Sequence, residues 1–317
     1  MKKSLKVALA TVCFIAAGVF FMGCANSNGG ENGLGGTGGS GSSGGGVTYI
    51  GTKAPGTALA VGDIVFNDGS ATPYSKIDER TEKECTKEEK AAAIAVIFRV
   101  GDGTEGNKTL GVGIKHEYLK WCKDSNVNGY NVKFTDTVVN FNGVAGSLTF
   151  TGKTDGNKNL MIMARTLDNT QGTENDTGLS KIRGNYVLPE KGEGQTISNF
   201  FYNMLKENYP AFEFAYYYGK NDGHNITSGS DFENDWYLPS LSELNDIYQA
   251  NKTDSVIENA LGVTGGDKFN GTWYYWSSSQ SANYYYNVYS FTFYNGDWYD
   301  DSKDSYENYV YAIRAFN

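Results

Sequence analysis

After its first 24 residues the chain has few of the side chains on which most catalytic and metal sites depend. Two cysteines, Cys85 and Cys122, and two histidines, His116 and His224, remain. Neither histidine has a partner at the spacing of a metal-binding pair, and no G-x-S-x-G or P-loop pattern occurs. We therefore expect no catalytic residue, no metal and no cofactor, and the chain is not predicted to be an enzyme.

The scarcity of cysteine leaves one structural question open. An even pair outside the cytoplasm can form one disulfide, and two buried free thiols fit the composition equally well. The spacing of Cys85 and Cys122 does not decide between these alternatives.

The chain also lacks basic runs. It carries 27 Lys and Arg against 36 Asp and Glu, and its first 23 residues hold three of the lysines and no acid. Without that segment the net charge is −12. Such an excess of acid argues against nucleic acid and anionic lipid headgroups as partners.

Residues 1–23 have the pattern of a bacterial signal peptide. Three lysines precede an apolar run from Val7 to Met22, which is short for a membrane span and ends before Cys24. A small residue directly before a cysteine resembles a lipoprotein cleavage box, although Phe21 and Met22 depart from the usual pattern. We expect lipidation of Cys24 and anchoring in the bacterial outer membrane at the cell surface; an ordinary secretory signal is the alternative.

Residues 24–46 consist almost entirely of Gly, Ser, Asn and Thr after the cysteine. This composition cannot bury apolar area, so we expect a flexible tether. A lipid at Cys24 would then hold the rest of the chain away from the membrane surface.

Residues 47–317 are long enough for one large domain and have a mixed pattern. Thr86 and Ser240 each open an S/T-x-x-E capping box, which predicts a helix. Further helices are expected at Ser198–Tyr209 and Ser255–Leu261. Strands are expected at Val61–Phe66, Ile94–Val100, Leu110–Ile114, Val138–Phe141, Ser147–Phe150, Leu160–Ala164 and, weakly, Ala211–Tyr218. The predicted class is α+β, with short helices, small antiparallel sheets and long loops.

The C-terminal region, residues 281–317, has the most unusual composition. Between Asn283 and Tyr309, 19 of 27 residues are Tyr, Asn, Asp or Ser. Tyrosine gives large contact area at low entropy cost, and the other three give adaptable hydrogen bonding, as in antibody paratopes. This composition favours a binding surface; the alternative is an edge hairpin whose tyrosines merely cover the sheet.

A regular alternation runs through this region. Tyr289, Phe291 and Phe293 fall on one face of a strand and are expected in the core together with Trp276 and Leu244. Ser290, Thr292 and Tyr294 fall on the other face, which is expected to be displayed. Asn295-Gly296 predicts a hairpin turn directly afterwards.

Three landmarks in order carry a family resemblance: WYLPSLSEL at 236–244, YWSSS at 275–279 and the closing Arg314-Ala315-Phe316. They resemble the C-type-lectin-like domain of the formylglycine-generating-enzyme type. They are most similar to the treponemal variable proteins, which are lipoprotein targets of diversity-generating retroelements. The resemblance implies a C-type-lectin-like fold and a variable region at about 281–317. The formylglycine-generating enzymes use a cysteine pair near their C-terminal end, and this chain has no cysteine after Cys122.

The resemblance also implies an origin for the composition. Such retroelements rewrite adenines, and a template rich in Asn codons then yields Tyr, Asp and His by one base change, or Ser, Thr and Ile by another. To encode Phe291 or Phe293, an Asn codon must change at both its first and its second base. No change at these two bases of an Asn codon encodes Lys303 or Glu307. The residues that single adenine changes can produce therefore tend to be those expected at the surface, and the others tend to be those expected in the core.

The resemblance and the pattern together predict one exposed, contiguous binding surface for an unidentified protein or glycan ligand, on a monomer. A fixed-specificity, carbohydrate-binding lectin is the alternative, with Ca²⁺ held by Asp297, Asp300, Asp301 and Asp304 as a further possibility. The predicted ligand-binding residues are Tyr284, Tyr285, Tyr286, Asn287, Ser290, Thr292, Tyr294, Asp297, Tyr299, Asp300, Asp301, Ser302, Asp304, Ser305, Tyr306, Asn308 and Tyr309.

Overall fold

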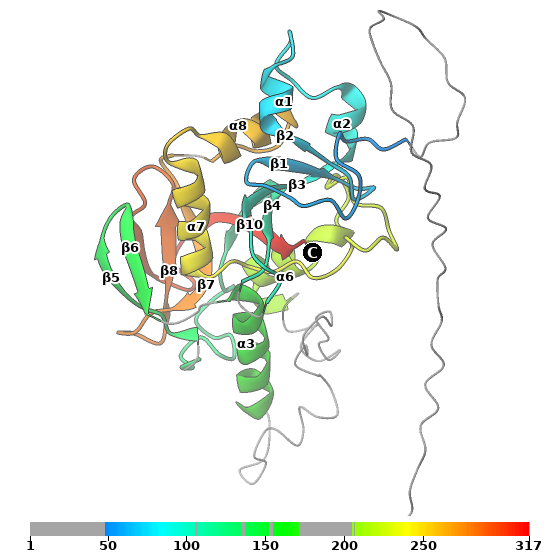
Figure 1. Cartoon of the computed structure of the whole chain (residues 1–317). Helices are drawn as coiled ribbons and strands as arrows, with labels where there is room; N and C mark the ends of the chain where they lie inside the picture. The colour runs from blue at the N-terminus through cyan, green and yellow to red at the C-terminus, as the bar shows by residue number, and fades with distance from the viewer. Residues whose placement is uncertain are drawn as a thin grey trace, which may run out of the picture. The chain divides into compact units, whose positions relative to one another are not determined.

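The computed structural model describes residues 48–104, 107–134, 137–151, 155–170, 205, 207–269 and 271–316. Val47–Asn317 forms one compact unit (Figure 1). The predicted signal peptide, the lipidation site and the tether lie outside the described residues, as does most of the helix predicted at 198–209.

One large sheet organises this unit. Eight strands lie in the order β2-β1-β3-β4-β10-β7-β8-β9, and every neighbouring pair is antiparallel except β10 and β7. The α+β class is confirmed, but the small sheets expected from the sequence are wrong, because most of the short strands join into one sheet. The strands are β1 Asp63–Phe66, β2 Ala71–Pro73, β3 Ala93–Arg99, β4 Leu110–Lys120, β7 Tyr274–Gln280, β8 Asn287–Thr292, β9 Trp298–Ser302 and β10 Glu307–Ala315.

A separate two-stranded sheet, β5 Asn140–Val144 with β6 Ser147–Thr151, packs against the β8–β9 end of the large sheet. Phe141 on β5 contacts the rings of Tyr289 on β8 and Trp298 on β9, with centroids 5.3 and 4.9 Å apart. This small hairpin therefore covers aromatic side chains that would otherwise face solvent.

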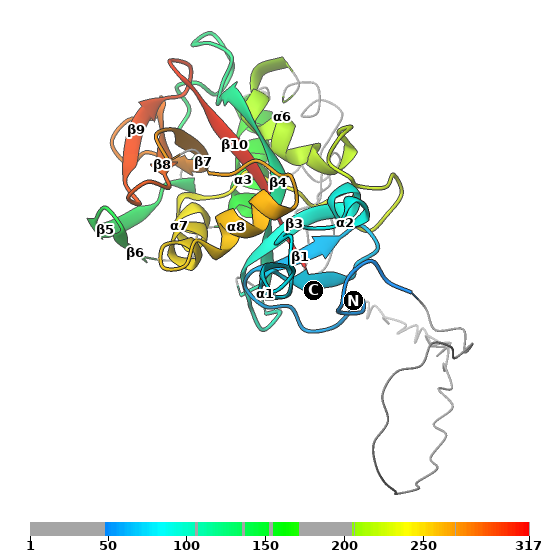
Figure 2. The ribbon, with the colours of Figure 1, turned by 90° about the horizontal axis from the view of Figure 1, so that it is seen from above.

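Helices α7 Leu241–Asn251 and α8 Val256–Val263 cover one face of the large sheet (Figure 2). Their apolar residues, such as Leu244, Ile247 and Leu261, pack against alternate residues of the strands, including Val112 and Phe291. All five are fully buried. This alternation is the period-two pattern of a strand whose one face meets a helix layer.

The opposite face is covered by α3 Gly156–Thr170 and α6 Pro210–Tyr216, so the unit has three layers (Figures 1 and 2). Gly113 on β4 shows how closely the layers approach. A Cβ atom at this position would lie 2.4 Å from the ring of Tyr218, which follows α6 and is fully buried. Glycine is required there because the tyrosine ring occupies the space of a side chain.

Both predicted capping boxes are confirmed. Thr86 caps α2 Lys87–Ala92 and Ser240 caps α7, each with the reciprocal bond from the glutamate three residues later. In α7 that glutamate, Glu243, is almost fully buried and also accepts bonds from the Gly156 amide (2.9 Å) and the Tyr237 hydroxyl (3.1 Å). Glu243 thus connects the start of α7 to the start of α3.

Two predicted strands are helices in the structure. Leu160–Ala164 lies within α3, and most of Ala211–Tyr218 lies within α6. In α3 the Asp155 carboxylate accepts a bond from the Lys158 amide, the geometry of an N-cap. In α6 Pro210 is the first helical residue, where its fixed φ suits the helix and its missing N–H costs nothing.

Cys85 and Cys122 are both free and buried. Of the two alternatives left open by the sequence, the structure therefore has two buried thiols and no disulfide between them. Burial raises the pKa of the Cys85 thiol to about 12 and that of the Cys122 thiol to about 11. Thiols that stay protonated at neutral pH are poor nucleophiles.

Among the described helices there is none with the length and apolar character needed to cross a membrane.

Candidate binding surface

The C-terminal region forms three strands of the large sheet, of which β8 and β9 lie at one end. β8 and β9 are joined by the predicted Asn295-Gly296 turn, where Gly296 has a φ of 72°. β9 is the edge strand, whereas β10 returns to the middle of the sheet, between β4 and β7. The tyrosine-rich region is therefore both a sheet edge and part of the scaffold.

The predicted core residues of this region are confirmed. Tyr289, Phe291 and Phe293 are at most 8% exposed, and Trp276 and Leu244 are fully buried. Phe291 contacts the rings of Tyr248 and Phe293, so it is held between α7 and the end of β8.

Three predicted surface residues are buried instead: Ser290, Thr292 and Asn308 are each at most 6% exposed. Ser290 lies in register with Trp276 on β7 and Tyr299 on β9, and rings on both neighbouring strands cover so small a side chain. Thr292 lies beside Tyr274 in the same way. Asn308 lies in register with Leu119 on β4, and its side chain lies beside the carboxylate of Asp301 on β9.

The remaining predicted residues reach solvent in part or fully. Six tyrosines among them are exposed, from Tyr286 at 40% to Tyr294 at 79%. Exposed positions are Tyr284, Tyr285, Tyr286, Tyr294, Tyr299, Ser305 and Tyr306; half-buried ones are Asn287, Asp297, Asp300, Asp301, Ser302, Asp304 and Tyr309.

These residues divide between the two ends of the β8–β9 hairpin. The 284–287 loop and the 303–306 turn lie together, because the Lys303 amide donates to the Tyr286 carbonyl. Tyr294 and Asp297 lie at the other end of β8, roughly 23 Å away at the rise of a strand. Tyr299 on the edge strand lies between the two groups.

A cluster of tyrosines forms at the first of these ends. Tyr286 stacks on Tyr284 with centroids 5.5 Å apart, and on Tyr130 with centroids 6.4 Å apart. The Tyr130 hydroxyl donates to an Asp304 carboxylate oxygen at 3.1 Å and lies 2.9 Å from the Ser302 hydroxyl. The loop that carries Tyr130 is thus part of the surface, which we call the tyrosine cluster: Tyr130, Tyr284, Tyr285, Tyr286, Ser302 and Asp304.

Lys303 anchors this cluster from beneath. Its side chain is fully buried, and its ammonium donates to the carbonyls of Gly129 (3.2 Å) and Tyr130 (2.9 Å). The rings of Trp121 and Phe134 lie 5.2 and 4.8 Å from the ammonium. Burial lowers the pKa of Lys303 to about 7, and the nearby Cys122 opposes this shift weakly.

The four aspartates proposed as Ca²⁺ ligands do not converge. Asp300 and Asp301 are consecutive on β9 and point to opposite faces. Asp300 accepts a bond from the Ser281 hydroxyl and Asp301 one from the Ser290 hydroxyl. Burial raises the pKa of Asp301. Within the described part of the chain, no three His, Cys, Asp or Glu side chains are placed to hold a metal ion.

A second group of aromatic residues was not identified from the sequence. Tyr118 on β4 and Trp273 just before β7 are 42% and 43% exposed, and their rings meet edge to face with centroids 5.5 Å apart. Tyr309 contacts both rings. His116 lies beneath Tyr309, and burial lowers its pKa. We call Tyr118, Trp273 and Tyr309 the aromatic triplet.

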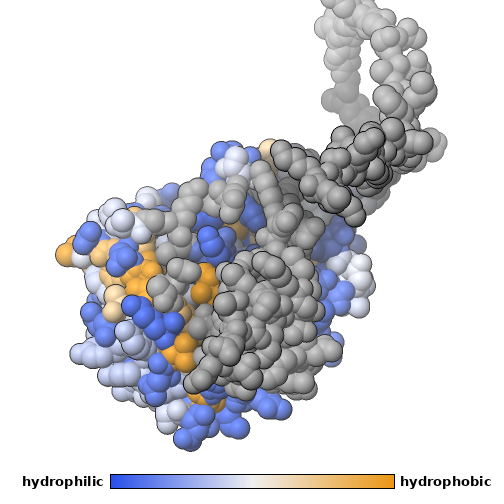
Figure 3. Space-filling model, turned by 90° about the horizontal axis from the view of Figure 1, so that it is seen from below, coloured by the Kyte–Doolittle hydropathy of each residue, from blue (hydrophilic) through white to orange (hydrophobic). Residues whose placement is uncertain are grey.

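Tyr118 and Tyr130 could not be assigned to the surface from sequence because they precede the variable region by more than 150 residues. Only the pairing of β4 with β10, and of Tyr130 with the 302–304 turn, brings them to it. Hydrophilic residues predominate over the described surface visible in Figure 3, and the apolar residues there form separate small patches.

No known family model matches the chain, and no curated protein is significantly similar to it. A solved structure with a partly similar arrangement is a fimbrial protein from Bacteroides ovatus, with 15% sequence identity and a TM-score of 0.48. The alignment covers 81% of this chain and 49% of that protein, so this chain spans about half of its length.

Proposed function

We propose that this chain is a cell-surface lipoprotein with a C-type-lectin-like fold, whose variable region, at about residues 281–317, carries a diversified ligand-binding surface. The proposed role is binding without catalysis. The ligand is a protein or a glycan that differs between variants of the chain.

One observation carries this proposal: a single tyrosine-rich segment holds both exposed tyrosines and fully buried apolar residues. Tyr284, Tyr286 and Tyr306 are 40–61% exposed, whereas Val288 and Phe291 are fully buried. A mechanism that changes residues blindly is tolerated only where side chains contribute little to folding. The exposure of these tyrosines supports that condition, and exposed aromatic side chains are the type that dominates binding energy once a partner covers them.

The coding DNA next to the gene tests the diversification part of the proposal. We expect a near-copy of the segment that encodes residues 281–309, differing mainly at adenines, beside a gene for a reverse transcriptase. A genome that holds neither feature would contradict diversification by a retroelement.

The anchor is tested separately. With Cys24 lipidated, the full chain should enter the detergent phase in Triton X-114 partitioning, and Cys24→Ala should move it to the aqueous phase. Unchanged partitioning of Cys24→Ala would contradict the lipid anchor. Protease treatment of intact cells should remove the chain if it is displayed on the outer surface.

The aromatic triplet favours a second candidate, a lectin of fixed specificity. Two of its three members, Tyr118 and Trp273, lie outside the variable region, and their partly exposed rings offer flat apolar faces to a sugar ring. For this candidate, Trp273→Ala should abolish signals on a glycan array, whereas Tyr306→Ser should leave them unchanged. The opposite result would favour the variable surface.

A further inference from the structure

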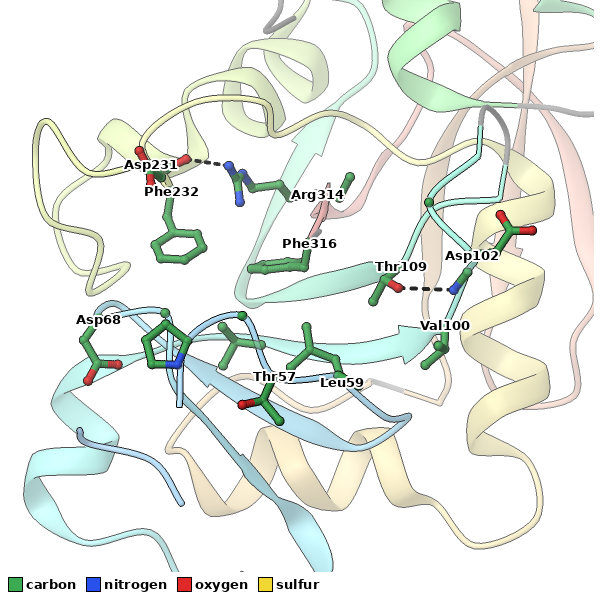
Figure 4. Close-up of a pocket in the computed structure, with 18 residues that line it drawn as sticks. Thr57, Leu59, Asp68, Val100, Asp102, Thr109, Asp231, Phe232, Arg314 and Phe316 are labelled. Atoms are coloured by element: carbon green, nitrogen blue, oxygen red, sulfur yellow. Dashed lines mark hydrogen bonds between the residues drawn. The ribbon is translucent and has the colours of Figure 1, made fainter. Parts of the chain in front are cut away.

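A cavity of about 880 Å³ lies beside the C-terminal end of β10 (Figure 4). It is lined by the 55–59 segment, the 100–103 turn, Phe232 and the last residues of β10 with Phe316. Arg314 and Glu307 mark opposite ends of β10, seven residues apart, so roughly 23 Å separates the cavity from the turn at 303–306. The volume is within the range of small-molecule sites.

Arg314 is the cation that lines this cavity, and it is only 8% exposed. Its Nε donates to the Asn234 carbonyl at 2.9 Å, and one terminal nitrogen donates to the Asp231 carbonyl. The rings of Phe232 and Phe316 lie 5.1 and 5.4 Å from the centre of the guanidinium. Burial lowers the pKa of Arg314, and the carboxylates of Asp235 and Asp231 oppose that shift.

The guanidinium forms no ion pair with any residue in the described part of the chain. Two of its five N–H groups donate to carbonyls. The remaining N–H groups can donate hydrogen bonds to a carboxylate. In Figure 4 the guanidinium lies above the gap between Phe232 and Phe316, at the edge of the cavity. A buried charge of this kind gains most from a partner of opposite sign.

The rest of the lining decides which anion fits. Leu59, Val65 and the two phenylalanines give the cavity apolar walls. Asp68, Asp102 and Asp231 also line it, and their negative charge disfavours ligands with several negative charges. The carboxylates of Asp68 and Asp102 are already engaged, with the Ser70 and Thr104 amides respectively.

We propose that this cavity binds a small monocarboxylate with an apolar body, whose carboxylate pairs with Arg314 and whose body packs on Leu59, Phe232 and Phe316. This site is distinct from the variable surface and does not depend on it. Its residues lie outside the variable region except for those at the end of β10, which periodicity and burial assign to the scaffold.

Isothermal titration calorimetry of the full chain with N-acetyl-L-phenylalanine tests the site, with the amide of the same compound as the uncharged control. We expect the acid to bind with a Kd in the millimolar range or tighter, and the amide to bind at least tenfold more weakly. Equal binding of both compounds, or binding of neither, would overturn the proposal without the need for any variant.

A substitution then locates the binding. Leu59→Trp fills the cavity and leaves Arg314 and the β8–β9 hairpin unchanged, so the acid should bind at least tenfold more weakly at an unchanged Tm. Tyr286→Ser, in the tyrosine cluster, should bind the acid as the unmodified chain does. Unweakened binding by Leu59→Trp, or loss of binding in Tyr286→Ser, would place the ligand elsewhere.

Discussion

Phe291 and Tyr294 are three residues apart and have opposite roles. Phe291 is fully buried between α7 and the end of β8, whereas Tyr294 is 79% exposed at the turn. Phe291→Ala should lower the free energy of unfolding by about 3–5 kcal/mol, because it removes a buried ring and leaves a cavity. Tyr294→Ala should change it by less than about 0.5 kcal/mol. Urea unfolding of both variants checks this, and similar losses would show that the strand faces are assigned wrongly.

Lys303 is a buried cation whose proton affinity depends on folding. Its pKa is lowered from 10.5 to about 7 by burial, so between these values the unfolded chain binds the proton and the folded chain does not. Its contribution to stability is therefore greatest above pH 10.5 and is lost as pH falls toward 7.

Comparison of the unmodified chain with Lys303→Met isolates this effect. The difference in unfolding free energy should shift in favour of the unmodified chain as pH rises from 7 to 9, by up to about 1.4 kcal/mol per pH unit. The matched control is Lys158→Met, the same substitution at an exposed lysine. A pH-independent difference for Lys303→Met would mean that Lys303 keeps its proton in the folded chain.

Burial of single residues was only partly predictable from sequence. Alternation correctly placed Phe291 and Phe293 in the core, because large apolar side chains and strand period agreed there. Alternation wrongly predicted that Ser290 and Thr292 are exposed. Their burial depends on rings of the neighbouring strands β7 and β9, and the sequence of β8 alone does not show which strands lie beside it.

At the scale of elements, Glu243 joins two helices that are far apart in sequence. Besides capping α7 it accepts the Gly156 amide at the start of α3. Burial and the nearby Asp155 raise its pKa to about 7. Glu243→Ala would leave the Gly156 and Ser240 amides buried without this acceptor, so we expect a loss of about 3 kcal/mol in unfolding free energy. A loss no larger than that of a variant at an exposed glutamate, Glu88→Ala, would contradict this role.

Elements with a local signal were predicted correctly, and elements decided by packing were not. The capping boxes at Thr86 and Ser240 contain their own hydrogen-bond partners, so both helix starts follow from sequence. The apolar run at 160–164 fits a short strand or a buried helix equally, and only its position against β7 selects the helix. The Asp155 cap was the available signal that could have corrected it.

For the whole molecule, the proposed function requires that the exposed tyrosines of the variable region contribute little to folding. Replacement of Tyr284, Tyr285, Tyr286 and Tyr306 together by serine should leave the Tm within a few degrees of that of the unmodified chain. The matched control replaces the buried Tyr275 and Tyr311 by serine and should lower the Tm severely, because both rings are fully buried. Unfolding of the first variant would show that these tyrosines are structural.

Hydrogen bonds from Tyr130 connect its loop to the turn that holds Ser302 and Asp304. Tyr130→Phe removes the hydrogen bonds to Ser302 and Asp304 but keeps the ring that stacks on Tyr286. We expect a small loss of stability, about 1 kcal/mol, from the lost hydrogen bonds. Urea unfolding measures it, and an unchanged stability would mean that the Tyr130 hydroxyl is free in solution.

Sequencing of the tail-coding DNA from many clones of one bacterial lineage tests the central claim most directly. The account predicts amino-acid differences concentrated at exposed positions such as Tyr284, Tyr294 and Tyr306, with Val288, Phe291 and Lys303 unchanged. Differences scattered evenly over residues 47–317, or equally frequent at the buried positions, would contradict a diversified binding surface.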